Sequence, residues 1–134
     1  MLPRDAAVTA REFATAYLQH DARDGHDASY SDAGQRAARY ASADLGAVLS
    51  QKRPAQDAPW SALRREQALV TVKVTDVYVP DGAPAPDSSS ALARVSYVQA
   101  TAPKSGPLRR EAGQFAVRLS RSAKGWQVTD LPWA

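Results

Sequence analysis

The sequence predicts an α+β fold in which N-terminal helices pack on the concave face of a curved antiparallel sheet of roughly four strands. Apolar residues recur at helical spacing in the first third of the chain. From Gln67 the period changes from about 3.6 to 2, and the later apolar runs follow one another as in a meander. We therefore expect one domain over residues 1–134, with helices over about 5–50 and the sheet over about 66–131.

The first helix is predicted from the segment VTAREFATAYLQHDA. Thr9 and Glu12 have the spacing of a capping box, although a start at Asp5 is the alternative. The segment DGHDASYSDAG that follows is typical of a loop. One face of the helix carries apolar or small residues, namely Ala10, Phe13, Ala14, Tyr17 and Leu18.

A second helix is predicted from Asp32, which with Gln35 repeats the capping spacing. We expect it to continue until QKRP ends the pattern, with Tyr40 and Leu45 facing the sheet. Its apolar or small positions are Ala37, Tyr40, Ala41, Leu45, Val48 and Leu49.

Four strands are predicted from runs with a period of two: ALVTVKVTDVYVP, ALARVSYVQATA, GQFAVRLSR and WQVTDL. Asp76 falls on the valine face of the first run, which suggests a bulge or a bend there. In the last run Trp126 and Val128 are expected to point inward. Trp133, near the end of the chain, is expected to pack locally, with an exposed partner contact as the alternative.

Composition excludes several classes of protein. The chain has no cysteine and only two histidines, so we expect no disulfide, no metal site and no cofactor. No apolar run is long enough to cross a membrane, so the chain is expected to be soluble as given, with any anchor or export signal upstream of Met1. The net charge is +3, but acidic residues sit beside most arginines, which favours a mixed solvated surface over a nucleic-acid interface.

The order of elements resembles the nuclear transport factor 2-like (cystatin-like) superfamily over almost the whole chain. More narrowly, the sequence is similar to actinobacterial conjugal-transfer proteins of the TcpC and VirB type and to Mce-associated proteins. This resemblance is carried by Phe13 and Tyr17 in an alanine-rich helix, by RAARYASADLGAVL, and by the closing GWQVTDLP. It implies a non-catalytic protein-interaction or assembly domain, extracytoplasmic and membrane-anchored in the full-length protein, in conjugation, type IV secretion or transport.

A small-molecule pocket is the alternative. In this superfamily the helices and the strongly bent sheet form a cone. Its enzymes, of the ketosteroid isomerase and dehydratase kinds, place an acid or base at the closed end or the mouth of this cone. Strand alternation points Asp76 inward among valines, where it could transfer a proton with His20, while Tyr17 and Tyr97 line the pocket. The competing interpretation is that Asp76 marks a bulge and stays solvated. No catalytic motif such as GxSxG, GxxxxGK or HExxH occurs.

An interaction surface is expected on the outward face of the sheet. Lys73, Arg94 and Arg118 alternate with the apolar positions, so they share this face and could form a basic stripe. Such a face suits a protein partner or self-association, provided that counter-charges meet the three cations. A nucleic-acid contact through the arginines is the third hypothesis.

Overall fold

The computed structural model describes residues 2–132. Over this range the chain forms four α-helices, two 3-10 turns and five strands. The helical segments are α1 Arg4–Leu18, α2 Asp32–Ala37, η1 Ala38–Tyr40, α3 Ala43–Leu49, η2 Pro54–Gln56 and α4 Asp57–Glu66. The strands are β1 His20–Asp21, β2 Leu69–Tyr78, β3 Ser90–Ala102, β4 Arg109–Ser122 and β5 Gly125–Asp130.

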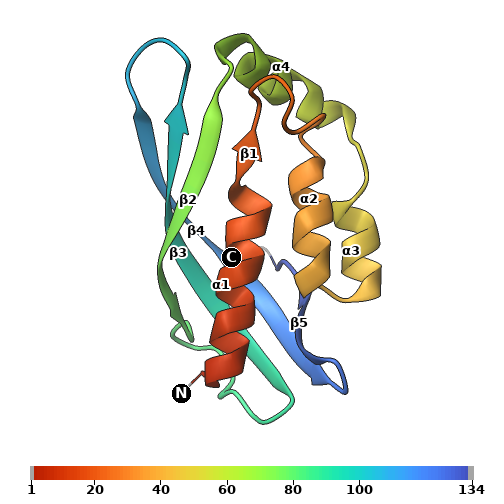
Figure 1. Ribbon diagram of the computed structural model, residues 1–134. Helices are drawn as coiled ribbons and strands as arrows, with labels where there is room; N and C mark the ends of the chain where they lie inside the picture. Colours follow the sequence, from red (N-terminus) through yellow and green to blue (C-terminus); the bar gives the residue numbers. More distant parts are fainter. Residues whose placement is uncertain (1, 133–134) are drawn as a thin grey trace.

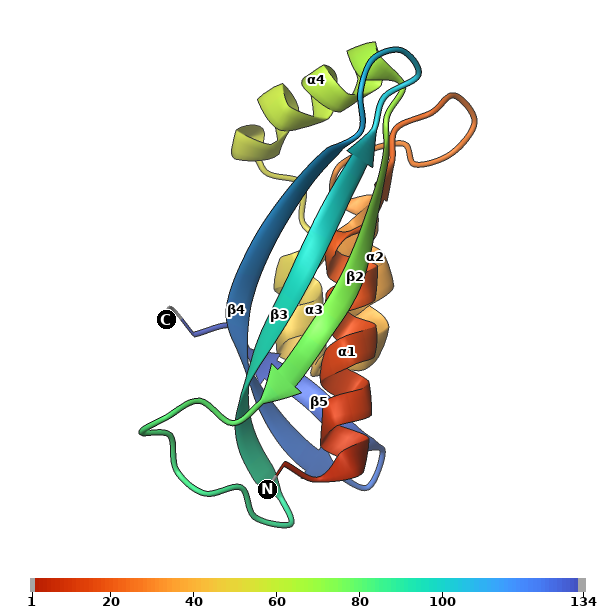
Figure 2. The ribbon, with the colours of Figure 1, turned by 90° about the vertical axis from the view of Figure 1, so that its left-hand side faces the viewer.

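The sheet has five strands in the order β1-β2-β3-β4-β5, and each pair is antiparallel. Helices α1, α2 and α3 cover one face (Figure 1). After a quarter turn about the vertical axis, the curved strands β2, β3 and β4 face the viewer and these helices lie behind or beside them (Figure 2). The α+β architecture with a curled antiparallel sheet is therefore confirmed, as is the pairing of strands in sequence order. None of the helices formed by residues 2–132 is long and apolar enough to span a membrane.

The core lies between α1 and the concave face of the sheet. Phe13 is fully buried, and the same core cluster contains the strand residues Val95, Val117 and Val128, each with no exposed surface. Tyr40 and Leu45 pack against this core, as the helical pattern predicts, and so does Trp126. Burial of such apolar side chains is the main stabilising contribution in a domain of this size.

The second helix is interrupted where one continuous helix was expected. Ala41 forms a parallel bridge with Val128, and the Ser42 amide donates to the Val128 carbonyl at 2.8 Å. The Ser42 hydroxyl oxygen then accepts from the Leu45 amide and caps α3. The break places backbone groups where the free edge of β5 can bond to them, which the apolar pattern alone does not indicate.

Several local predictions were wrong. Helix α1 begins at Arg4, one residue before the alternative start at Asp5, so Thr9 and Glu12 lie inside it and form no capping box. No side-chain capping bond is formed at the start of α2 either. Neither β1 nor α4 was predicted, and β1 is too short to show a period. Trp133 lies outside the described residues.

The outer edge of β2 is protected by α1 where β1 ends. The Arg11 guanidinium donates to the Val74 carbonyl at 3.0 Å, and the Val72 amide donates to the Gln19 side-chain oxygen at 3.2 Å. Unpaired strand edges can recruit other strands, so these two bonds satisfy part of an otherwise open edge.

Candidate functional site

Asp76 is exposed and does not reach the concave face. The pairing of β2 with β3 shifts register between Val74 and Asp76, so Thr75 is the extra residue of a bulge. One extra residue reverses the alternation, because successive side chains point to opposite faces. Asp76 therefore pairs with Ser96 on the outer face, while Val77 takes the inward position opposite Val95. The bulge was predicted correctly, but the inward placement of Asp76 was wrong.

Lys73, Arg94 and Arg118 lie on the outer face of the sheet, in different rows. Their cross-strand partners are Val98 for Lys73, Tyr78 and Ala116 for Arg94, and Leu92 and Asp130 for Arg118. Arg94 and Arg118 are diagonal neighbours on adjacent strands, whereas Lys73 lies four residues, or about 13 Å, further along β3.

The same outer face carries negative charges. The Arg118 Nε lies 4.0 Å from an Asp130 carboxylate oxygen, and both side chains are exposed. Because the bulge turns Asp76 outward, this carboxylate also belongs to the face. We call Lys73, Asp76, Arg94, Arg118 and Asp130 the outer-face charges. They include charges of both signs, so the face carries the negative counter-charges that a basic stripe alone would lack.

On the opposite side of the sheet, three of the predicted residues meet at a cavity of about 340 Å³. Tyr17 comes from the end of α1, His20 from β1 and Tyr97 from β3, and Asp76 is not among the lining residues. The remaining lining residues are Leu18, Tyr30, Ala33, Gly34, Val48, Leu49, Arg53, Gln56 and Gln99. A second hollow of about 370 Å³ shares Tyr17, Leu18, Arg53 and Tyr97 and extends to Leu131 and Pro132.

His20 forms part of the cavity wall although it is only 4% exposed. Its ring stacks on Tyr30, with 4.1 Å between the ring centroids, and its Nδ1 is buried with no hydrogen-bond partner among the described residues. Burial, aided by the positive charge of Arg36, lowers the His20 pKa to about 4 against the opposing effect of Asp27. The ring is therefore neutral near pH 7.

The tyrosines of the cavity are held by aromatic and close backbone contacts. Tyr17 stacks on Phe13 at 5.5 Å between centroids, and Tyr97 meets Phe115 edge-on at 6.0 Å. Tyr97 also lies over Gly113, where a Cβ would come within 2.5 Å of the phenol oxygen. Gly113 thus leaves the room that the Tyr97 ring occupies. Burial raises the pKa of Tyr97 and of Tyr30.

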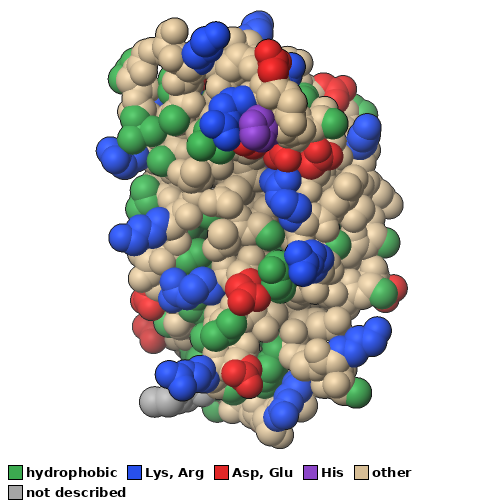
Figure 3. All heavy atoms as spheres, viewed as in Figure 1, with side chains coloured by type: hydrophobic (Ala, Val, Ile, Leu, Met, Phe, Trp, Pro, Cys, Tyr) green, Lys and Arg blue, Asp and Glu red, His purple; other side chains and the backbone are tan. Residues whose placement is uncertain are grey.

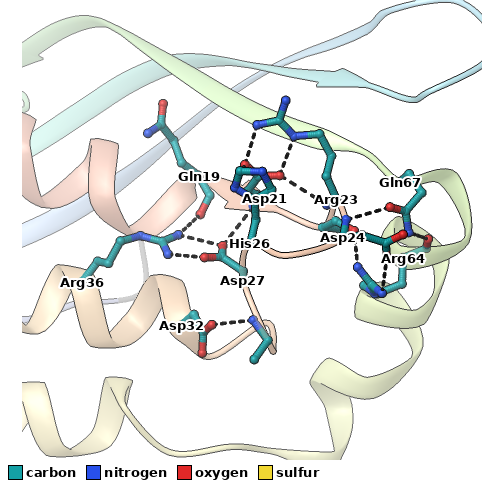
Figure 4. Close-up of polar contacts among 12 residues, drawn as sticks. Gln19, Asp21, Arg23, Asp24, His26, Asp27, Asp32, Arg36, Arg64 and Gln67 are labelled. Atoms are coloured by element: carbon teal, nitrogen blue, oxygen red, sulfur yellow. Dashed lines mark hydrogen bonds and ion pairs between the residues drawn. The ribbon is translucent and has the colours of Figure 1, made fainter.

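A polar network lies beside the cavity in the loop between β1 and α2 (Figure 4). Asp27 accepts two hydrogen bonds from Arg36, which also donates to the Gln19 carbonyl. Asp21 accepts from Arg23 at 2.7 Å, and this hydrogen bonding lowers the Asp21 pKa to about 2. Charges of both signs are interspersed on this face of the molecule, as Figure 3 shows.

Acidic and histidine side chains in this loop are engaged with partners other than a metal. His26 Nδ1 lies 3.1 Å from Asp21, and Asp24 pairs with Arg64 at 2.9 Å. Within residues 2–132, no group of three or more histidine, aspartate or glutamate side chains is arranged to hold an ion. The network instead ties the loop to α2 and α4.

Tyr30, Arg53 and Gln56 were missed as cavity residues. Tyr30 stands in a glycine- and serine-rich loop, while Arg53 and Gln56 flank a proline after the second helical pattern. Neither segment has a period, so nothing in the sequence relates them to Tyr17 or Tyr97. The one available signal was Tyr30, a large aromatic residue inside an otherwise polar loop.

Comparison with solved structures shows the same fold in type IV secretion proteins. An IcmL-like type IV secretion system protein from Legionella pneumophila superposes with a TM-score of 0.68 at 18% identity, covering 98% of this chain and 91% of that one. Agrobacterium tumefaciens VirB8 gives a TM-score of 0.66 at 14% identity, covering 98% and 93%. CagV, a VirB8 homolog from Helicobacter pylori, gives 0.63 at 7% identity, covering 97% and 96%.

No protein-family model matches the chain, and no curated protein matches it by sequence. At identities of 7–18%, likeness to the three structures establishes a common fold. The chain thus shares its fold with these type IV secretion proteins, as the VirB-type resemblance implies.

Proposed function

We propose that this chain is a non-catalytic assembly domain of a type IV secretion or conjugation apparatus. The proposal is supported by a fold shared, over 97–98% of the chain, with three proteins of such systems. The observation that carries it is the outer sheet face, which none of α1, α2 and α3 covers and which bears charges of both signs.

The outer-face charges suit contact with a second copy of the same face. A two-fold interface brings the same patch together twice, so anions on one copy can face cations on the other. Lys73, Arg94 and Arg118 supply the cations, and Asp76 and Asp130 supply the anions. Charge complementarity of this kind fixes orientation and excludes wrong partners more than it adds affinity.

The cellular location of the domain and its narrower protein class are part of the same proposal. We infer an extracytoplasmic domain that is membrane-anchored in the full-length protein. The narrower classes that we consider come from the sequence resemblance. They are actinobacterial conjugal-transfer proteins of the TcpC type and Mce-associated proteins.

Sedimentation equilibrium tests the proposed self-association. The wild type should associate at concentrations up to about 1 mM, where an association of about −4 kcal/mol is half-complete. Lys73→Glu combined with Arg118→Glu should reduce association at least about ten-fold, because each copy then presents mainly negative charge. Lys52→Glu changes an exposed cation outside the sheet and should have no effect.

A wild-type protein that stays monomeric throughout this range would contradict self-assembly through the outer face. Equal association of the double variant and the Lys52→Glu control would show that a different surface is used.

A further inference from the structure

The cavity beside His20 has the composition of a binding site for a small organic anion. Three phenol rings, from Tyr17, Tyr30 and Tyr97, form much of its wall. The Arg53 guanidinium is its one cation among the described residues, and neither aspartate nor glutamate occurs among the described residues that line it. Its volume of about 340 Å³ falls in the range of small-molecule pockets.

Arg53 is available to a bound anion. Its side chain is exposed and forms no ion pair with any described residue. Its hydrogen bonds involve the backbone: the amide donates to the Gln56 side-chain oxygen, and the carbonyl accepts from the Gln56 amide. By contrast Arg23, Arg36, Arg64 and Arg109 are each paired with a carboxylate. A guanidinium binds a carboxylate through two parallel hydrogen bonds, so a free one at a cavity mouth favours such a ligand.

His20 is the second and independent feature. A buried polar side chain normally finds a hydrogen-bond partner, and leaving one unpaired costs about 1–3 kcal/mol. Here Nδ1 is sealed without a partner, while the ring lines the cavity. The other ring nitrogen, Nε2, is therefore the polar atom that can meet a bound molecule. Because the ring is neutral, it can form a hydrogen bond to a ligand without competing with Arg53 for the negative charge of that ligand.

The walls indicate the shape of the ligand. The His20 and Tyr30 rings lie stacked with an interplanar angle of 27°, and Tyr17 and Tyr97 both pack against Phe115. Aromatic side chains make their best contacts with flat apolar surfaces. The Gln99 amide is engaged in holding the end of α1, through a 2.7 Å bond to the Leu18 carbonyl, so it maintains the wall.

We propose that this cavity binds a small aromatic carboxylate, with the carboxylate on Arg53 and the ring among Tyr17, Tyr30, Tyr97 and His20. The ligand would occupy the side of the sheet opposite the outer-face charges. Binding there is compatible with the proposed assembly function and does not depend on it.

A matched pair of probes tests the proposal, namely 2-naphthoate and 2-naphthylmethanol, which share the ring system and differ in charge. Heteronuclear NMR titration of the full chain should give naphthoate a Kd below about 1 mM. Shifts should be confined to the neighbourhood of the lining residues. The neutral alcohol should bind at least about five-fold more weakly, because it lacks the ion pair.

Two variants and one control locate the site. Arg53→Gln should weaken naphthoate binding to the level of the alcohol and leave the affinity for the alcohol unchanged. Arg39→Gln, an exposed arginine that does not line the cavity, should behave as wild type. Val48→Trp should block both probes, because Val48 is 43% exposed on the cavity rim and tolerates a larger side chain without repacking the core.

Failure of both probes to bind would overturn the proposal, as would shifts centred on the outer sheet face. Equal binding of the two probes, with no effect of Arg53→Gln, would overturn the assignment of an anionic ligand. None of these outcomes bears on self-association, which depends on residues across the sheet.

Discussion

The two ends of the space between α1 and the sheet are built differently. Near the middle of α1, Phe13 is enclosed by alanine, valine and leucine side chains that leave it no exposed surface. At the C-terminal end of α1, the same layer opens into a cavity lined by tyrosines, glutamines, His20 and Arg53. One end is filled by small and branched apolar residues, and the other by large polar and aromatic residues that do not close the gap.

This difference in packing predicts that one end contributes mainly to stability and the other mainly to ligand binding. A close-packed apolar interior contributes most when nothing can enter it. A cavity lined with polar groups contributes less to folding, because those groups are incompletely paired until something fills the space. We therefore expect substitutions at the closed end to change mainly the free energy of unfolding, and substitutions at the open end to change mainly pH dependence and ligand binding.

The largest expected effect is at the closed end. Phe13→Ala should lower the free energy of unfolding by about 3–5 kcal/mol, because it removes a fully buried ring and leaves a cavity. Tyr17→Ala, one turn later and only partly buried, should cost distinctly less. Urea denaturation of both variants measures the contrast. Equal losses would mean that the two ends are packed alike.

The next effect concerns His20 at the open end. Its pKa is depressed to about 4 in the folded protein, against about 6.5 in the unfolded chain. Between these values the unfolded state binds a proton that the folded state does not, so stability should fall as pH drops from about 6.5 toward 4 and then level off with respect to this group. The loss is at most about 3 kcal/mol.

Urea denaturation between pH 7 and pH 4.5 measures this loss. Two variants separate the histidines, the only two in the chain. His20→Leu should largely remove the pH dependence in that window, whereas His26→Gln, which changes an exposed ring, should retain it. An unchanged dependence in His20→Leu would show that carboxylates are responsible.

The smallest expected effect is at Asp76. Since this side chain is exposed on the outer face, Asp76→Asn should change the free energy of unfolding by no more than about 0.5 kcal/mol. Val77→Asn, one residue later but facing the core, should cost more than about 1 kcal/mol. Similar losses for the two variants would contradict the register set by the bulge.

Much of the fold could be predicted because it depends on local periodicity. The valine alternation of β2 and the helical spacing of Phe13, Ala14 and Tyr17 each describe which side of one element is apolar. The break at Ala41 and Ser42 could not be predicted, because it is stabilised by bonds to Val128, far away in the sequence.

The candidate sites were predicted in part for the same reason. Tyr17 and Tyr97 lie on the inward faces that their periods indicate, and both line the cavity. Asp76 was misplaced because a bulge shifts the alternation by one residue, and its orientation depends on whether Thr75 or Asp76 is the extra residue. Tyr30 and Arg53 come from aperiodic segments.

The sequence by itself determined the class of fold, the order of the strands and the apolar faces that form the core, because periodicity specifies how each element meets its neighbours. The tertiary structure alone decided that Asp76 joins the outer face, that His20 is buried and neutral, and that Arg53 reaches the tyrosines. These properties depend on strand register and on contacts between segments far apart in the chain, which no local pattern encodes.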